Sequence, residues 1–446
     1  MKNSTFIFVC LLLTNISFAT QVKSSSLSII SMVTNLNTQK NTNNSTDVPA
    51  NILALPLINI SDFTYQGAFR IKSGTKGESK PSYSHGRLAF NSDHNSLFLS
   101  GFNLHGSIAE FEIPPLVISD QITDLNIGAY RQEFRKVLSE SDTGNTQNIN
   151  RVGGMEYING ELLIQVYDYF DGGANNTHTS LVARDANNLS TSNIDGFFEF
   201  SGKAHEILWV SPIPPEYQAI LGGDYISGAS SADQVSINAR SSMGPSAWIF
   251  NSSDIIGKQA SSGQIPSTAI LDFSLAHIMA DTPSGWLPFS KYSGVIQFNY
   301  QTDVWFPTIF GKEFLDAYDP KNVGNNDIWT DSASANYGLI IPGTRTYAVF
   351  GQFSMRLSGG GYKIMQDNGH ICQGPCQFKR ADTEHYYWLF DMADMIAVKQ
   401  GVKQPYEVKP YARGRFNTPF NTIDDPKGKT MRPRIAGGTY DESSGT

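Results

Sequence analysis

Short alternating runs of hydrophobic and polar residues, separated by Gly- and Asn-containing turns, cover most of the chain. Residues 85–114, HGRLAFNSDHNSLFLSGFNLHGSIAEFEIP, contain two apolar runs joined by a polar turn, a Gly-centred turn, and a stretch at 109–113 in which hydrophobic and acidic residues alternate. A period of two places successive side chains on opposite faces of a strand. This segment therefore predicts three consecutive strands.

Looser copies of this phrase recur along the chain, each with Gly before a strand. They are RVGGMEYINGELLIQVYDYF from Arg151, GPSAWIFNSSDII from Gly244, GLIIPGTRTYAVFGQF from Gly338 and GGTYDESSGT from Gly437. A strand, a turn and a second strand are typical of the inner half of a four-stranded propeller blade. The intervals, roughly 65 to 100 residues, exceed the ~40 to 50 residues of a compact blade. Each interval holds either one blade with a long insertion or two blades, and we favour the second option, which gives five to seven blades.

A ring of sheets buries apolar faces that an isolated sheet would expose to water. One four-stranded sheet exposes an apolar face and unpaired backbone edges, whereas radially packed blades bury their faces against neighbours. The alternative is a large β-sandwich, which also has alternating strands and Gly/Pro turns. The repeat extends through nearly the whole chain, so we predict an all-β protein with a β-propeller fold.

Composition agrees with many short strands and excludes one class of partner. The chain of 446 residues contains 27 Phe, 19 Tyr, 39 Gly and 21 Pro, which suits aromatic-rich strands and tight turns. Its formal net charge is −8, and no run of Lys and Arg provides the basic surface that nucleic acids need. We expect no nucleic-acid partner and no membrane span.

The first residues have the pattern of an export signal. Lys2 precedes an apolar run at 6–13, and a small-x-small motif follows at 17–19. We therefore expect a signal peptide at 1–19, a disordered Ser/Thr/Asn-rich tether at 20–57, and a propeller domain at 58–446. The mature protein is expected to be secreted or periplasmic. Because TYDESSGT at 439–446 resembles the first strand and turn of a blade, we also expect a ring truncated at the C-terminus.

Four stretches carry a resemblance to a known family. They are GRLAFNSDHNSLFLSGFNLHGSIAEFEIP, ARSSMGPSAWIFNSSDI, YGLIIPGTRTYAVFGQF and WLFDMADMIAVKQGVKQPYEVKPYARGRFNTPF. Together they resemble a family of uncharacterised exported bacterial proteins with a propeller-like fold, and the similarity covers most of residues 63–446. The resemblance implies the fold, but no reaction and no catalytic residues are attached to this family.

Two cysteines remain outside the expected signal. Cys372 and Cys376 lie in GHICQGPCQF, with His370 before them and His385 after them. In an exported protein two such thiols most simply form a disulfide. A zinc site built from these four residues is an alternative, although their spacing matches no standard zinc motif. A third possibility is that both cysteines are free thiols.

No standard catalytic motif is present, so candidates come from residue types near strand ends. The chain lacks HExxH, GxSxG and a phosphate-binding loop. His85, His105, Arg151, Tyr167 and Arg240 are the candidate catalytic residues, because β-elimination on an acidic sugar needs a cation, a base and an acid. The alternative is that these residues only connect loops and blades.

Two further kinds of site were considered. Trp305, Tyr386 and Tyr387 are candidate ligand-binding residues, since aromatic rings stack on sugars, and their alternative role is to fill blade interfaces. We expect no cofactor and no metal site, with Ca²⁺ at the loops 171–173 and 322–331 as the alternative. Carboxylate pairs for glycoside hydrolysis cannot be selected from spacing alone.

Three hypotheses of function follow. The first is a propeller that binds a glycan or another cell-surface ligand without chemistry of its own. The second is a polysaccharide-active enzyme, a lyase before a hydrolase, and the third is a protein-interaction scaffold. An enzyme predicts convergence of His, Tyr and Arg, or of two carboxylates, in one pocket, whereas a binding module predicts an aromatic platform.

Overall fold

The structure is a computed structural model. It describes residues 48–231, 237, 240–260, 263–274, 276–279, 328–330, 332–355, 366, 377, 380–420 and 434–445 in full. For residues 8–13, 296–299, 304–307, 360–362, 375–376, 423–425 and 429–431 it describes the backbone strands.

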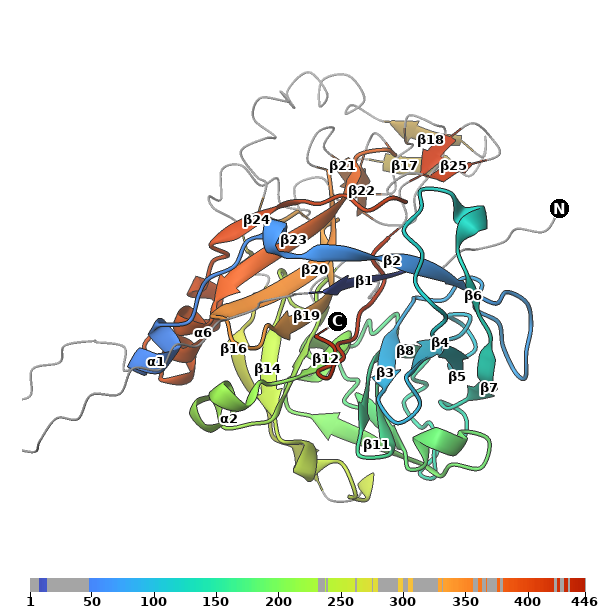
Figure 1. Ribbon diagram of the computed structural model, residues 1–446, viewed down its shortest axis with the longest axis horizontal. Coiled ribbons are helices and arrows are strands. Elements are labelled where there is room, and N and C mark those ends of the chain that lie inside the picture. The colour runs from blue at the N-terminus through green and yellow to red at the C-terminus, as the bar shows by residue number, and fades with distance from the viewer. Residues whose placement is uncertain are drawn as a thin grey trace, which may run out of the picture.

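The protein is a β-propeller of four blades (Figure 1). Blade 1 consists of β3 (Leu88–Asn91), β4 (Ser96–Ser100), β5 (Ser107–Glu112) and β7 (Tyr130–Lys136). Blade 2 consists of β8 (Arg151–Ile158), β9 (Glu161–Tyr167), β10 (Ser180–Ala183) and β11 (Ile194–Phe200), with β15 (Gln264–Ile265) added in parallel. Blade 3 consists of β12 (Trp209–Pro212), β13 (Tyr225–Gly228), β14 (Ala247–Phe250) and β16 (Thr268–Leu271). Blade 4 consists of β19 (Ser334–Ile340), β20 (Thr346–Ser354), β23 (Thr383–Asp391) and β24 (Ala412–Arg415).

This architecture confirms the all-β propeller and corrects the blade number. Four separate antiparallel sheets stand around a centre, so the β-sandwich is wrong, and so is the expectation of five to seven blades. Long intervals hold one blade each because insertions separate its strands. In blade 4, for example, the stretch between β20 and β23 adds the small hairpin of β21 (Gly360–Tyr362) and β22 (Pro375–Gln377).

The inner strands pack closely around the centre. β3 lies beside β8, β8 beside β12, and β12 beside β19. A Cβ added to Gly153 on β8 would lie 1.9 Å from the carbonyl oxygen of Ile207, and one on Gly154 would lie 2.5 Å from the Trp209 Cα. Only glycine permits such an approach of backbones. The glycines of the recurring phrase therefore reflect contact between blades 2 and 3.

The C-terminal segment 434–445 lies between the inner strands of blades 4 and 1, near the middle of the ring (Figure 1). The Asn336 side-chain amide of β19 donates to the Ile435 carbonyl at 2.8 Å. The Phe90 backbone N–H of β3 donates to Thr439 Oγ1 at 2.9 Å. This segment bridges the junction without forming a regular strand, so the expectation of a blade strand and turn at its end is wrong.

One of the repeated phrases was also assigned to the wrong position in a blade. GPSAWIFNSSDII contains β14, which is the third strand of blade 3, and its second half forms a 3-10 turn. The true inner strand is β12, whose sequence Trp209–Pro212 is too short to show alternation. Its central position follows from its contacts with the inner strands of the two neighbouring blades, β8 and β19, and not from its sequence period.

A strand outside the blades runs from the side of blade 4 towards blade 1 (Figure 1). β2 (Thr64–Ile71) pairs antiparallel with β1 (Phe8–Leu13) and in parallel with β6 (Ile127–Gly128). The apolar run expected to be an export signal thus includes β1, and the signal and its cleavage remain predictions. Val48 and Ile52 lie in the main core, within the stretch expected to be a tether.

In the described part of the chain, helices are few and short. They are α1 (Ala50–Leu53), α2 (Pro215–Leu221) and α6 (Met392–Lys399), with 3-10 turns at 60–62, 122–124, 186–188, 203–205, 252–254 and 405–407. α6 begins where the Asp391 side chain accepts the Ala393 backbone N–H at 2.8 Å, a standard N-cap. The remaining hairpins pair β17 (Ile296–Asn299) with β18 (Val304–Pro307) and β25 (Ile423–Asp425) with β26 (Lys429–Met431).

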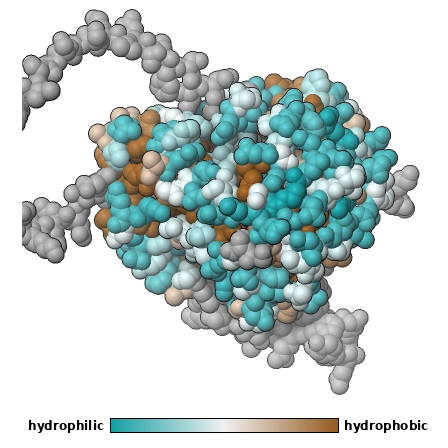
Figure 2. All heavy atoms as spheres, turned by 90° about the horizontal axis from the view of Figure 1, so that it is seen from below, coloured by the Kyte–Doolittle hydropathy of each residue, from teal (hydrophilic) through white to brown (hydrophobic). Residues whose placement is uncertain are grey.

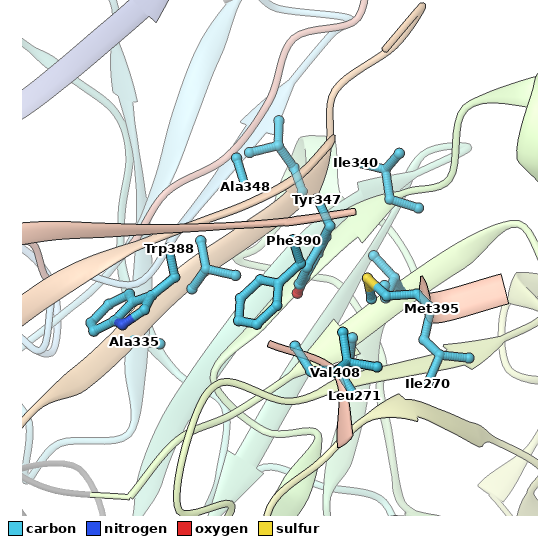
Figure 3. Packing of buried hydrophobic residues seen from close by; sticks show 14 of the residues in the cluster. Ile270, Leu271, Ala335, Ile340, Tyr347, Ala348, Trp388, Phe390, Met395 and Val408 are labelled. Atoms are coloured by element: carbon cyan, nitrogen blue, oxygen red, sulfur yellow. The ribbon is translucent and has the colours of Figure 1, made fainter. Parts of the chain in front are cut away.

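The largest core cluster fills the junction of blades 3 and 4 (Figure 3). Tyr347 and Phe390 of blade 4 lie on the side of Leu271 of β16 and Met395 of α6, and Trp388 lies farther along the sheet beside Ala335. Burying these large side chains removes apolar surface from water, which stabilises the fold by about 25 cal/mol for each Å² buried. The helix therefore covers a blade junction and is not a separate domain.

The surface is mainly hydrophilic on the face shown in Figure 2, and hydrophobic residues gather towards the end where α1 and α6 lie. Leu53 and Val402 are among the exposed hydrophobic side chains of this end. Within the described part of the chain, none of the helices is long and apolar enough to cross a membrane.

Candidate functional site

A pocket opens at the junction of blades 1 and 2, at the end of the ring where the inner strands begin. Its cavity volume is only about 10 Å³, the size of roughly one water molecule, and reaches about 200 Å³ only when the open solvent at its mouth is included. Blade 1 provides most of its lining, and Arg151 and Val152 at the start of β8 complete it. The lining residues from blade 1 are His85, Ser100, Gly101, Phe102, Asn103, Gly106 and Ser107. Among these described lining residues, none is acidic.

His85 is held from both sides of its ring. Its Nδ1 lies 3.2 Å from the Tyr167 hydroxyl oxygen, and its Nε2 lies 3.3 Å from the Asn103 amide nitrogen. An amide N–H that donates to Nε2 leaves the ring proton on Nδ1, which then donates to Tyr167. In this tautomer, Nε2 carries the lone pair on the side of the pocket-lining Asn103.

Tyr167 lies behind His85 and not in the pocket. It is the last residue of β9, only 4% exposed, and its backbone pairs with Arg151 across the β8–β9 hairpin. Burial raises the pKa of its hydroxyl to about 12, although Arg87 and Arg151 act in the opposite direction. The phenol is therefore neutral at pH 7 and fixes the orientation of the imidazole.

Arg151 provides a cation at the pocket. Its Nη1 donates to the backbone and side-chain oxygens of Asn150 at 2.9 and 3.1 Å, which fix the guanidinium. The guanidinium carbon lies 5.0 Å from the ring centroid of Tyr169, a cation–π distance. Arg151 Nε is buried and has no hydrogen-bond partner in the structure.

Arg87 is a fully buried cation near the centre of the ring. It is 1% exposed, and its Nη1 donates to the carbonyl oxygens of Leu208 in blade 3 and Asn336 in blade 4, both at 3.3 Å. Burial lowers its pKa to about 10, against the influence of Tyr167 in blade 2. Arg87 is still charged at pH 7, and its side chain connects blade 1 with the other three blades.

Burial and these cations together determine the protonation of His85. Its pKa falls to about 3, first because of burial and then because of Arg87, Arg151 and Arg434. The imidazole is therefore neutral over the whole physiological range. A negatively charged ligand near Arg151 would offset part of this effect and make His85 a stronger base.

Two other catalytic candidates have local structural roles. His105 Nδ1 lies 3.0 Å from Ser79 Oγ, and its ring packs edge-on against Phe102 at 4.7 Å. Arg240 donates from Nε and Nη2 to the carbonyl oxygens of Asp171 and Gly172 at 2.7 and 2.9 Å. The structure thus brings His85, Tyr167 and Arg151 together, while His105 supports a pocket wall and Arg240 secures a nearby loop.

The aromatic candidates do not form a platform in the described structure. Tyr386 is 2% exposed and packs between Phe353 and Trp388 in blade 4, so its face is not available to a ligand. Tyr387 is partly buried on the opposite face of the same strand, and its ring centroid lies 6.4 Å from that of Tyr386. The Trp305 side chain lies outside the described residues.

The cysteine and metal predictions remain largely outside the described residues. Cys372 and the side chain of Cys376 are not described, so the disulfide and its alternatives stay predictions. In the loop 171–173, two carbonyl oxygens that were considered for Ca²⁺ accept the Arg240 guanidinium instead. Among described side chains, no group of three metal-ligating residues occurs.

Sequence reasoning missed Asn103 and Arg87 as parts of the site. Asn103 lies in a turn, FNLHG, and carried no signal apart from its position two residues before His105. Arg87 stands next to the first strand in HGRLAF, and arginine is usually an exposed residue, so the sequence carried no sign of its burial. Its central position depends on blades 3 and 4, which no local pattern reveals.

Comparison of the chain with protein-family models, with curated proteins and with solved structures gave no match.

Proposed function

We propose that the pocket between blades 1 and 2 binds an acidic sugar of an extracellular polysaccharide and cleaves the chain by β-elimination. The observation that supports this most is the contact of 3.2 Å between His85 and Tyr167 beside Arg151, in a pocket whose described lining has no carboxylate. A hydrolase of the usual kind needs two carboxyl groups across the scissile bond.

The proposed reaction uses one base and one cation. Arg151 pairs with the uronate carboxylate and stabilises the negative charge that develops as the α-proton leaves. When the substrate replaces the Asn103 amide as the partner of His85 Nε2, this nitrogen takes the proton from C5. The electron pair of the C–H bond forms the C4–C5 double bond, and the bond from C4 to the glycosidic oxygen breaks. The imidazolium then gives the same proton to the leaving oxygen, so neither water nor a redox partner is consumed.

The electrostatics of the pocket suit an anionic substrate. In the free protein, His85 is a weak base because burial and three arginines disfavour its charged form. A carboxylate paired with Arg151 neutralises one of these charges and raises the pKa of His85 when the substrate is present. Tyr167 acts as a positioning residue, because it contacts His85 and lies behind it.

A second candidate function is glycan binding without chemistry. Tyr169 and Phe170, which follow β9 across the hairpin from Arg151, are exposed, and exposed aromatic rings bind sugar faces in lectin-like sites. This candidate and the lyase share the acidic ligand and differ only in turnover.

One experiment separates the two candidates. The purified protein is incubated with a panel of acidic and neutral polysaccharides, and the absorbance of unsaturated uronates, new reducing ends and the melting temperature are recorded. The lyase predicts absorbance that is lost in His85→Ala. A higher melting temperature with an acidic polymer and no product would support binding alone, and no response to any acidic polymer would contradict both.

A further inference from the structure

Tyr83 is an exposed aromatic residue held in an unusual backbone conformation. Its φ is +58°, in the left-handed region that bulky side chains rarely adopt, and its side chain is 53% exposed. Such conformations persist only where the surroundings impose them. Here the Asn103 N–H donates to the Tyr83 carbonyl at 3.2 Å, and Ser84 bridges to Phe102.

This conformation places Tyr83 at the edge of the pocket. Its ring meets the ring of Phe102 edge-on at 5.9 Å between centroids, and both Phe102 and Asn103 line the pocket. The strained backbone does not bury the Tyr83 side chain, which stays about half exposed. Its exposed ring is therefore better explained by a ligand than by stability.

A cation accompanies the aromatic residues on this side of the pocket. Lys80 Nζ lies 5.4 Å from the Phe102 ring centroid. The blade 2 side has the same combination, because Arg151 lies 5.0 Å from the ring of Tyr169. The pocket is thus flanked by two aromatic–cation pairs, one from each blade.

We propose that Tyr83 and Lys80 form a second sugar subsite, which binds the uronate next to the one held by Arg151. The ring of that sugar stacks on Tyr83, and its carboxylate faces Lys80. This inference rests on the proposed acidic-glycan function and narrows the substrate to polymers in which acidic sugars are adjacent.

The test measures binding of defined oligouronates, from disaccharide to hexasaccharide, prepared from polygalacturonate and from alginate. Tyr83→Gly removes the ring and relieves the backbone conformation, so the variant should melt at or above the wild-type temperature. Loss of one stacking contact should weaken hexasaccharide affinity roughly three- to tenfold. Tyr83→Phe should keep the wild-type affinity.

A matched control is Ile127→Ala, since Ile127 is also 53% exposed but lies on β6, which contributes no residue to the pocket. Its affinity should equal that of the wild type. Unchanged hexasaccharide affinity in Tyr83→Gly would overturn the subsite while leaving the proposed function intact. Binding that depends on Tyr83 without turnover would remove the lyase alone, and a wild type that binds no oligouronate would remove both.

Discussion

His85 Nδ1 lies 3.2 Å from the Tyr167 hydroxyl oxygen, and this contact joins the beginning of blade 1 to the end of the second strand of blade 2. The two residues are far apart in the chain and meet only because β3 and β8 are neighbours at the ring centre. The contact sets the tautomer of a neutral imidazole. The function that we propose depends on it.

Tyr167→Phe should reduce turnover while leaving substrate affinity nearly unchanged. The variant keeps the ring volume but removes the oxygen that accepts from His85 Nδ1, so the imidazole loses its fixed tautomer. We expect kcat to fall by up to about 100-fold, because general acid–base catalysis as a whole contributes roughly 100- to 10,000-fold, with KM within a factor of about two. Steady-state kinetics give both values, and a large rise in KM at constant kcat would contradict a positioning role.

Arg87→Met should raise the pKa of His85. Arg87 is the largest charged contributor to the low pKa of that imidazole, and methionine fills similar space without charge. Arg87→Lys keeps the charge and should leave the pKa low. Titration of the His85 ring signals by NMR measures the change, and equal pKa values in the methionine variant and the wild type would show that Arg87 does not contribute.

Acid should destabilise the fold through His85. The folded-state pKa of about 3 lies below the ordinary value of 6.5, so between these values the unfolded chain binds a proton that the folded one does not. The free energy of unfolding should therefore fall with decreasing pH by roughly 1.4 kcal/mol per pH unit from this group.

His85→Asn removes that contribution and keeps a neutral polar side chain. Denaturant unfolding of both proteins between pH 6.5 and pH 4 should give curves that diverge as the wild type loses stability faster. Parallel curves would mean that His85 titrates normally in the folded protein.

Glu206 should have the opposite pH dependence. This buried carboxyl accepts from Ser227, Ser267 and the Gly202 N–H, and burial raises its pKa from 4.5 to about 7. Because the folded-state value is raised, its contribution is complete below pH 4.5 and is lost as pH rises through 7.

At roughly 1.4 kcal/mol per pH unit, the Glu206 effect amounts to about 3 kcal/mol. Glu206→Gln stays neutral and should remove the alkaline loss, as measured by denaturant unfolding from pH 4 to pH 9. A glutamine variant that still loses this stability at alkaline pH would place the titration at another group.

The fold class could be predicted from the alternation of hydrophobic and polar residues and from the recurring glycines, because both patterns lie within short stretches of sequence. Gly153 and Gly154 in RVGGMEY indicate a crowded strand, and the structure shows the contact with Ile207 and Trp209 that requires them. The blade number could not be predicted. β12 is too short to show a period, and the insertion between β20 and β23 lengthens one blade to the size of two.

The candidate site was predictable only in part. His85, Arg151 and Tyr167 were named from residue type and position near strand ends, and they converge. His105 was chosen by the same reasoning but turns towards Ser79 and Phe102. Arg87 joins carbonyl oxygens of two distant blades, and such long-range contacts leave no trace in a local pattern.

Cleavage in water enriched in heavy oxygen tests the central claim most directly. β-Elimination uses no water, so mass spectrometry of the products from a susceptible acidic polysaccharide should show unsaturated fragments without the label. These fragments should be absent with His85→Ala. Saturated fragments that carry heavy oxygen at the new reducing end would show hydrolysis instead, and would contradict the role assigned to His85, Tyr167 and Arg151.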